Sequence, residues 1–293
     1  FFQFHPTALK LDGAPSFLIS EALRGEGAVL VDSFGKSPVE HLEGKDLAPR
    51  DQVSRALFKA IQKQNIDHIG LDVKSIAVED VEARFPSIFQ RCRELGLEPL
   101  KEVIPVAPSA HYWMGGVATN LKAQTNVKGL FAIGEVACTG LHGANRLASN
   151  SLMECLVFAN QMQNIELNDL QTSYISGENL SFNKSNLRFS KDQGTKYLKK
   201  EIEKLRQLCW REAGVDRSRK GMSSALTKVK RDYQNLLKEP LLDLVFSQSK
   251  NAINQFDEIA RRDLNLLLDL SNRQMSSLLM LEACLFRKES RGG

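Results

Sequence analysis

The stretch Thr139-Gly-Leu-His-Gly-Ala-Asn-Arg-Leu-Ala-Ser-Asn-Ser-Leu152 carries most of what this sequence says about fold and chemistry. It follows the apolar run 129–135, which predicts a buried strand. The glycine-rich turn contains His142 and Arg146, and a helix is expected to begin at Asn150-Ser151. A strand, a turn and a helix N-terminus in this order direct backbone N–H groups and a cation at an anionic ligand. We therefore expect an anion-binding site here.

The bulk composition is that of a soluble globular protein. The chain has 293 residues, of which 42% are hydrophobic and 25% charged, enough for two modest domains or parts of three. The net charge of +4 is small and spread out, so nucleic-acid or membrane binding is not expected. The chain contains no run of 18 apolar residues and no visible signal peptide, which favours a cytoplasmic protein.

The cysteines give no sign of a disulfide framework or a metal site. Their number is odd, their spacing is wide, and no Cys-x-x-Cys occurs, so reduced and mostly buried thiols are expected. They are Cys92, Cys138, Cys155, Cys209 and Cys284.

Secondary-structure signals change along the chain. Helical spacing of apolar residues predicts a helix over Arg50–Gln64. Residues 16–26 are expected to form a helix or a turn-rich segment, and residues 78–95 a helix. Residues 69–73 alternate as a strand does. Residues 170–194 are polar and aperiodic, which indicates a linker. Three apolar stripes after residue 196 predict helices that bury a shared core as a bundle.

Ser151 and Glu154 match the Ser-x-x-Glu pattern of a capping box, which supports a helix beginning at this point.

Four further segments carry polar groups suited to an anionic substrate. Arginine pairs bidentately with carboxylates and stays charged, so several arginines and histidines that converge would suit a small dicarboxylate. Taken singly, each such residue is more often a solvated surface group, and it is their joint presence that favours a site. The segments are Phe4-His-Pro-Thr7, Ser20-Glu-Ala-Leu-Arg-Gly-Glu-Gly27, Leu47-Ala-Pro-Arg-Asp51 and His111-Tyr-Trp-Met-Gly-Gly116.

These segments, in this order, resemble the succinate dehydrogenase/fumarate reductase flavoprotein family. The resemblance implies an FAD-binding α/β domain interrupted by an α+β capping domain and followed by a helical bundle. It assigns residues 1–112 to the capping domain, 113–180 to the C-terminal portion of the FAD-binding domain, and 181–293 to the bundle. It also implies a non-covalent FAD cofactor.

The resemblance carries substrate roles to individual residues. It implies that His5 and Ser20 hold one substrate carboxylate, and that His111 and Arg146 hold the other. Arg50 matches the residue that transfers a proton. A free guanidinium has a pKa above about 12, so a donor role in the fumarate-reducing direction is easier to accept than a role as a base. Glu21 and Arg24 match a polar relay that supplies this proton.

The flavin contacts follow in the same way. Glu135 resembles the residue that accepts a hydrogen bond from a cofactor hydroxyl, and Ser151 and Leu152 resemble those whose backbone meets the isoalloxazine at a helix N-terminus. That position suits a reduced, anionic flavin. The family's strand–Gly-x-Gly-x-x-Gly–helix unit does not occur in this sequence. The resemblance places it before Phe1, so we expect an N-terminally truncated chain that is inactive alone.

Within the family, the residues of these motifs are most similar to those of the branch that oxidises L-aspartate. Particularly similar are Arg146-Leu-Ala-Ser-Asn-Ser-Leu152 and Leu47-Ala-Pro-Arg-Asp51. This branch implies oxidation of L-aspartate to iminoaspartate with oxygen or fumarate as acceptor, the first step of de novo NAD synthesis, with quinolinate synthase as the downstream enzyme. Two main alternatives are a succinate dehydrogenase or fumarate reductase subunit and a truncated, inactive interaction module. A nucleic-acid binder that uses the basic C-terminal helices is a third.

Overall fold

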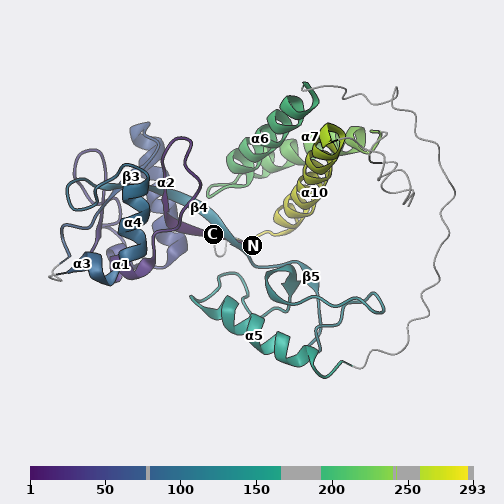
Figure 1. Cartoon of the computed structure of the whole chain (residues 1–293), viewed down its shortest axis with the longest axis horizontal. Coiled ribbons are helices and arrows are strands. Elements are labelled where there is room, and N and C mark those ends of the chain that lie inside the picture. Colours follow the sequence, from purple (N-terminus) through teal and green to yellow (C-terminus); the bar gives the residue numbers. More distant parts are fainter. Residues whose placement is uncertain (77–79, 166–192, 240–241, 243–257, 290–293) are drawn as a thin grey trace. The chain divides into compact units, whose positions relative to one another are not determined.

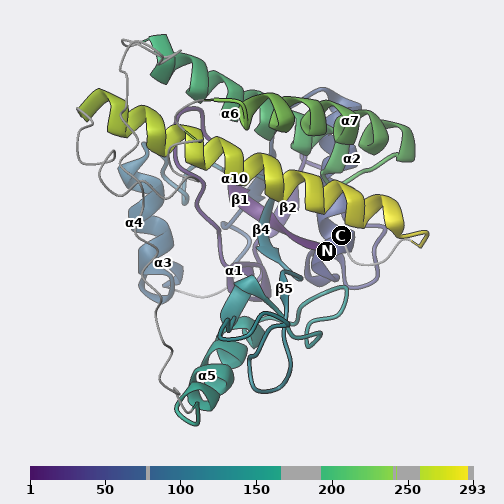
Figure 2. The same cartoon turned by 90° about the vertical axis from the view of Figure 1, so that its right-hand side faces the viewer.

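A computed structural model describes residues 1–76, 80–165, 193–239, 242 and 258–289. They form two compact units, the first within residues 1–165 and the second within residues 193–289 (Figures 1 and 2). The predicted linker 170–194 lies almost entirely outside the described residues, as does the expected boundary at residue 180.

A four-stranded antiparallel sheet forms the centre of the first unit. The strands lie in the order β1-β4-β3-β2, so the first strand pairs with the last. Their bounds are β1 Phe2–Leu9, β2 Val29–Val31, β3 Ile69–Asp72 and β4 Ile104–Trp113. All eight residues of β1 are buried, because the sheet and helix α2, Arg50–Gln64, cover this strand. The predicted strand at 69–73 is confirmed within one residue.

Helix α2, Arg50–Gln64, packs on β1 and β4 and has the bounds that the sequence predicts. It begins after Pro49 and ends at Asn65, whose left-handed φ of 54° is typical of a helix C-terminus. Leu57 is fully buried, as are Leu71 of β3 and Phe89 of the neighbouring helix α4, Pro86–Glu94. These side chains belong to one apolar core under the sheet.

Short helices complete this part of the unit. The segment expected over 16–26 contains α1, Glu21–Gly25, with Ser20 as its N-cap. The segment expected over 78–95 contains α3, Val81–Arg84, and α4, Pro86–Glu94. A 3-10 turn, Lys45–Leu47, precedes α2.

Two irregularities of the β1–β4 ladder coincide with the site histidines. Between His5 and Ala8 the register gains one residue on β1, and this bulge contains Pro6, which has no N–H to donate. Between Gln3 and Phe4 the partner strand gains one residue, and that extra residue is His111. A bulge changes the direction of the side chains beside it. The ladder irregularities thus set the direction of both imidazoles.

The rest of the first unit joins a short parallel strand pair to a helix. The elements are β5 Val117–Ala118, the 3-10 turn η2 Gly134–Val136, β6 Ala137–Cys138 and α5 Asn150–Met162. The strand predicted over 129–135 is wrong. Only one bridge, between Gln124 and Phe131, forms there, and Leu130 is half exposed. A strand needs a ladder partner along its length, whereas the described residues here form this bridge and two backbone hydrogen bonds beside it.

Among its described residues, the second unit has three long helices that share a core (Figures 1 and 2). They are α6 Gln193–Ala213, α7 Arg219–Leu236 and α10 Glu258–Phe286. Leu198, Val229 and Leu267 are almost fully buried, one from each helix. The helical periodicity predicted after residue 196 is therefore confirmed. None of the described helices is long and apolar enough to cross a membrane.

The β5–β6 contact depends on the absence of a side chain at Gly116. This residue has a φ of 131°, and a Cβ there would lie 2.2 Å from the carbonyl oxygen of Val136. We expect Gly116→Ala to lower the free energy of unfolding by about 2–3 kcal/mol, from backbone strain plus overlap. Chemical denaturation would measure it.

Gly140→Ala is the matched control for that measurement. Gly140 also has a left-handed φ, 82°, but a Cβ there meets no described atom within 4 Å. This substitution should cost about 1–2 kcal/mol, from strain alone. Equal losses for the two variants would show that close approach to Val136 is unimportant.

Candidate functional site

Two histidines from neighbouring strands form the centre of the site. His5 lies on β1 and His111 on β4, and their rings meet edge to face with centroids 5.3 Å apart. His5 is 5% exposed, while His111 is partly buried. The sheet therefore brings together two imidazoles that lie far apart in the chain.

Hydrogen bonds fix the neutral tautomer of His5. The Thr7 backbone N–H donates to its Nδ1 at 3.3 Å, so Nδ1 is unprotonated and Nε2 carries the proton. Burial lowers the pKa of His5 from 6.5 to about 3, and the positive charge of Arg50 adds to this effect. His5 is therefore a neutral donor at physiological pH.

His111 has the opposite tautomer. Its Nδ1 lies 3.1 Å from the carbonyl oxygen of Gln3, which can only accept, so Nδ1 carries the proton. Its Nε2 then accepts from Nη2 of Arg146 at 3.1 Å. Burial lowers the pKa of His111, and the charges of Arg50 and Arg146 lower it further, against the backbone hydrogen bond to Gln3. In this arrangement His111 orients the Arg146 guanidinium.

Arg146 is a buried cation that has no carboxylate partner among the described residues. It is 8% exposed, and its Nη1 donates to the Ser151 hydroxyl at 3.1 Å. Within the described part of the chain, no carboxylate lies within ion-pair distance of it, and its Nε has no hydrogen-bond partner. Burial lowers the pKa of Arg146, as does the charge of Arg50. A carboxylate from a ligand would supply the missing partner.

Arg50 is the electrostatic centre of this group. It begins helix α2, and its Nε and Nη2 both donate to one oxygen of Glu21 at 2.6 Å. Its positive charge lowers the pKa of His5, His111 and Arg146. The predicted residues from β1, α1, α2 and β4 thus share one electrostatic neighbourhood.

Arg24 lies behind Arg50 and is almost fully buried, with an exposed fraction of 2%. Its Nη1 donates to the backbone carbonyl of Asp46, while Nε and Nη2 have no partner among the described residues. Burial lowers the pKa of Arg24, against the raising effects of Glu21 and Asp46. The arrangement places a second buried guanidinium next to the Arg50–Glu21 pair.

Ser20 is the one predicted substrate residue that the described contacts do not join to the others. Its side chain is exposed, and its hydroxyl accepts from the Ala22 backbone N–H at 3.2 Å as the N-cap of α1. The adjacent Glu21 does reach the cluster through Arg50. The helix cap accounts for Ser20 locally, and its predicted substrate contact stays a prediction.

The predicted flavin residues lie around the N-terminus of α5. Ser151 is in its first turn and contacts Arg146, while Leu152 is 69% exposed. Glu135 accepts from the Trp113 backbone N–H at 2.9 Å, which ties η2 to the end of β4. The N-cap, Ser149, has a left-handed φ of 66° and no side-chain cap hydrogen bond.

These features fit the flavin end of FAD. An uncapped helix N-terminus attracts an anionic ring, and an exposed apolar face suits a flat aromatic group. On α5 that face contains Leu152, Met153, Leu156 and Val157, each at least half exposed.

The capping box predicted from Ser151 and Glu154 is wrong. The helix begins at Asn150 with Ser149 as N-cap, and Ser151 accepts from Arg146 instead. Glu154 is turned inward and is 2% exposed. It accepts from the Thr139 hydroxyl at 2.5 Å and lies 2.8 Å from Nε2 of His142. Tertiary partners therefore replace the local cap.

Sequence reasoning missed three residues of the site. Gln3 is 3% exposed, and its amide nitrogen donates to the Arg146 carbonyl oxygen at 2.6 Å. The Tyr112 ring lies 4.2 Å from the Arg146 guanidinium carbon. Glu154 is the third. The one available signal in the sequence was the amide of Gln3 within the mostly apolar segment 2–9. Gln rarely occupies a core position without a hydrogen-bond partner, so such a residue points to a polar contact.

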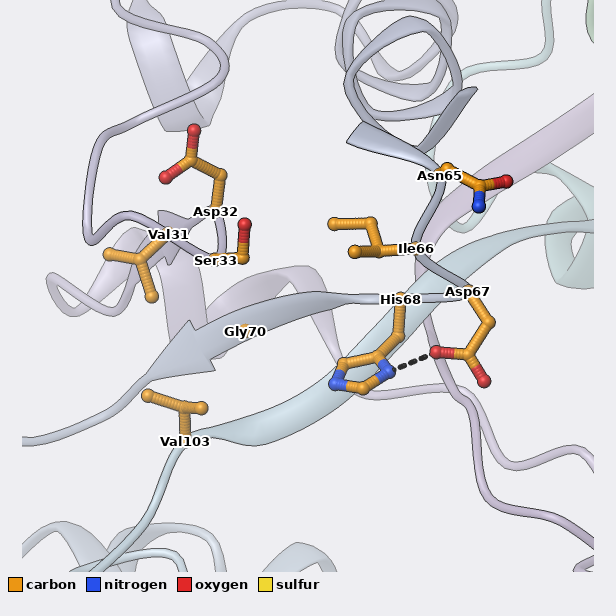
Figure 3. A pocket seen from close by; sticks show the side chains of 9 residues that line it. All are labelled: Val31, Asp32, Ser33, Asn65, Ile66, Asp67, His68, Gly70 and Val103. Atoms are coloured by element: carbon orange, nitrogen blue, oxygen red, sulfur yellow. Dashed lines mark hydrogen bonds and ion pairs between the residues drawn. The ribbon is translucent and has the colours of Figure 1, made fainter. Parts of the chain in front are cut away.

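A pocket of about 570 Å³ lies elsewhere in the first unit (Figure 3). Its lining comes from the ends of β2 and α2 and from β3, and includes the Asp67–His68 pair at 2.6 Å. None of the predicted site residues lines it. Its acidic groups are engaged locally, since Asp32 accepts from Phe34, Lys36 and Gln64.

Comparison with known proteins agrees with the geometry at α5. A family model described as an FAD binding domain matches residues 1–152, just over half of the chain. The chain belongs to this FAD-binding family. Its cofactor is FAD, as the sequence predicts.

Similar members of the FAD-binding family bear one enzyme name. An L-aspartate oxidase from Nostoc sp. is 43% identical over all of this chain and 52% of its own length. Another L-aspartate oxidase, from Synechocystis sp., is 42% identical over all of this chain and 54% of its own length. The chain therefore spans about half the length of the curated relatives it matches.

Among solved structures, this chain is similar in fold to fumarate reductase flavoproteins. A quinol–fumarate reductase with menaquinol molecules matches with a TM-score of 0.72 at 28% identity, over all of this chain and 52% of that chain. A mutant of the E. coli quinol–fumarate reductase matches with a TM-score of 0.71 at 27% identity, over the same shares of both chains. The expected flavoprotein fold is thus confirmed at the level of its class.

The depressed pKa of His5 links stability to pH. The unfolded chain protonates this histidine near pH 6.5, whereas the folded chain does so only near pH 3, so acid favours unfolding. Stability should fall as pH drops from about 6.5 to about 3, by up to about 1.4 kcal/mol per pH unit from this group. Urea titrations of wild type and His5→Gln across this range would measure it. Parallel profiles would contradict the assignment.

Proposed function

We propose that this chain forms part of an L-aspartate oxidase, an FAD-dependent oxidoreductase that converts L-aspartate to iminoaspartate. The similarity to two enzymes of that name across the whole chain supports the reaction. The observation that carries the substrate class is Arg146, which is buried beside His111 without a carboxylate partner among the described residues. Together with His5 and Arg50, it makes a cationic site suited to a molecule with two carboxylates.

Each end of the substrate has its own donors in this proposal. Arg146 and His111 hold one carboxylate, and His5 holds the other with Ser20. His5 suits this role because its protonated Nε2 is a neutral donor that does not titrate near neutral pH. In the structure, Nε2 of His111 accepts a hydrogen bond from Arg146. His111 can donate to the substrate carboxylate through Nε2 only after this atom gives up that hydrogen bond and gains a proton.

The reaction removes a hydride from Cα and a proton from the amino nitrogen. FAD, when bound, supplies the hydride acceptor. In this direction Arg50 takes up the amino proton as it passes one of its own to Glu21, because both Nε and Nη2 of Arg50 meet one Glu21 oxygen. In the fumarate-reducing direction the same pair would donate a proton. Arg24 keeps positive charge behind the pair. The other contribution of these residues is to position the substrate.

FAD would be held by the groups around α5. The backbone N–H groups at Ser151 and Leu152 would face the flavin, and Glu135 would accept from a cofactor hydroxyl. The uncapped α5 N-terminus and its exposed apolar face support this assignment. In the whole protein, residues 1–112 would form the capping domain, 113–180 the end of the FAD-binding domain, and 181–293 the helical bundle.

Further consequences belong to the same proposal. Oxygen or fumarate would accept the electrons, the product would enter de novo NAD synthesis, and quinolinate synthase would consume it. We place the reaction in the cytoplasm.

The second candidate is a flavoprotein subunit of fumarate reductase or succinate dehydrogenase. The TM-score of 0.72 to a quinol–fumarate reductase favours this class, since both enzymes would use the same dicarboxylate site. The higher sequence identity of 43% to an oxidase favours L-aspartate.

Flavin bleaching distinguishes the two candidates. The full-length protein, loaded with FAD and kept without oxygen, would receive L-aspartate or succinate while the visible flavin absorbance is followed. Bleaching by L-aspartate supports the proposal, whereas bleaching by succinate alone assigns the protein to the second class. A flavin that neither compound bleaches would overturn both.

Arg50→Gln in the full-length protein should lower kcat by about 10²- to 10⁴-fold, because proton transfer loses its acid/base residue. FAD content should stay unchanged, as Arg50 contacts Glu21 and not α5. Steady-state kinetics and the flavin-to-protein absorbance ratio would measure both. Arg55→Gln is the matched control, an arginine on the same helix paired with Asp51. Loss of FAD from Arg50→Gln would contradict the proton-transfer role and would show that Arg50 is needed for cofactor binding.

Arg146→Leu should lower kcat/KM by about 30- to 1000-fold, because a bidentate contact to a carboxylate is lost and the substrate Cα is no longer oriented. Arg146→Lys keeps the charge without the planar fork, so it should fall between wild type and Arg146→Leu. Kinetics across a series of dicarboxylates would test this order. Unchanged kinetics in both variants would remove Arg146 from the site.

A further inference from the structure

The guanidinium of Arg146 is held by neutral contacts, and none of the described residues forms an ion pair with it. Ser151 and His111 meet its two terminal nitrogens at 3.1 Å each, and Tyr112 lies under its face with the ring centroid 4.2 Å from Cζ. Such a cation–π contact stabilises a desolvated arginine without occupying its N–H groups. The contact with the ring face therefore leaves the N–H groups to Ser151, His111 and the Leu147 carbonyl oxygen, neutral partners that a ligand carboxylate would replace.

Tyr112 in turn rests against His142. The two rings meet edge to face with centroids 5.6 Å apart and an interplanar angle of 85°, and the Tyr112 hydroxyl lies 3.4 Å from Nε2 of His142. Tyr112 is near the end of β4, whereas His142 lies in the turn before α5. This contact joins the sheet to the segment that carries Arg146.

Glu154 anchors His142 from inside the first unit. The two side chains, His142 and Glu154, are 8% and 1% exposed, and Nε2 of His142 lies 2.8 Å from the Glu154 carboxylate. The second Glu154 oxygen accepts from Thr139 at 2.5 Å, so the carboxylate is fixed at both ends. The negative charge of Glu154 also raises the pKa of Tyr112, second to burial. A buried anion thus lies behind the ring on which Arg146 is stacked.

We propose that Tyr112, His142 and Glu154 form a positioning chain that orients Arg146 for a dicarboxylate. The inference rests on the proposed function, because it assigns Arg146 a carboxylate. Glu154 and His142 fix the Tyr112 ring, and the ring fixes the plane of the guanidinium. Placing the balancing carboxylate behind the ring keeps it from competing with the substrate for the arginine N–H groups. None of the three residues touches the substrate in this scheme.

Kinetics and ligand binding of single and double variants of the full-length, FAD-loaded protein test the positioning chain of Tyr112, His142 and Glu154. Tyr112→Leu removes the aromatic face and should weaken binding of a dicarboxylate about 2- to 30-fold. Tyr112→Phe keeps the face and should rescue most of that loss. Glu154→Gln should raise KM more than it lowers kcat, since positioning of the carboxylate is affected and the Arg50–Glu21 pair is not. Binding would be followed by calorimetry with succinate and L-aspartate separately, without oxygen.

The decisive comparison uses Arg146→Leu as the background. In that variant, adding Tyr112→Leu should cause no further loss of dicarboxylate affinity, because the residue it positions is already gone. Additive losses would overturn the positioning chain and assign Tyr112 to general stability. If Arg146→Leu itself leaves dicarboxylate affinity unchanged, the proposed function fails instead. If Tyr112→Leu loses FAD, His142→Gln takes its place, and its effect on dicarboxylate affinity is measured with and without Arg146→Leu.

Discussion

Arg146 remains buried with no carboxylate among the described residues near enough to pair with it, and this constraint determines most of the site. Burying an isolated charge costs several kcal/mol, so the protein needs compensating contacts that do not fill the ligand's place. It uses a hydroxyl from Ser151, an imidazole nitrogen from His111 and the face of Tyr112. All three are neutral. A ligand carboxylate is the strong partner that this arrangement leaves out.

The sheet makes that arrangement possible. The β1–β4 ladder is interrupted next to both site histidines, with a bulge at Pro6 and Thr7 and another at His111. A regular antiparallel ladder would direct side chains strictly to alternate faces, whereas these two shifts place His5 and His111 edge to face. Arg50 reaches the same place because α2 packs across both strands. Strand irregularity and helix packing therefore build one cationic cluster.

The cluster contains buried polar atoms without partners. Among the described residues, Arg24, Arg146 and Gln3 each keep a buried side-chain atom without a hydrogen bond, and so do His142, Thr119, Asp263 and Gln274. Burying a polar group without a partner is costly, so each such group needs an explanation, and a bound ligand is one. For the two guanidinium groups that feel the charge of Arg50, a ligand carboxylate would supply the missing partner.

The sequence by itself determined the helix Arg50–Gln64, the strand near residues 69–72 and the helical second unit, because these follow from local periodicity. It also singled out the residues of the cluster, through motifs that resemble a flavoprotein family. The tertiary structure alone decided that residues 129–135 form no strand, since a ladder needs a partner strand. It also decided that Glu154 turns inward to His142 rather than capping α5, since long-range partners replaced a local one.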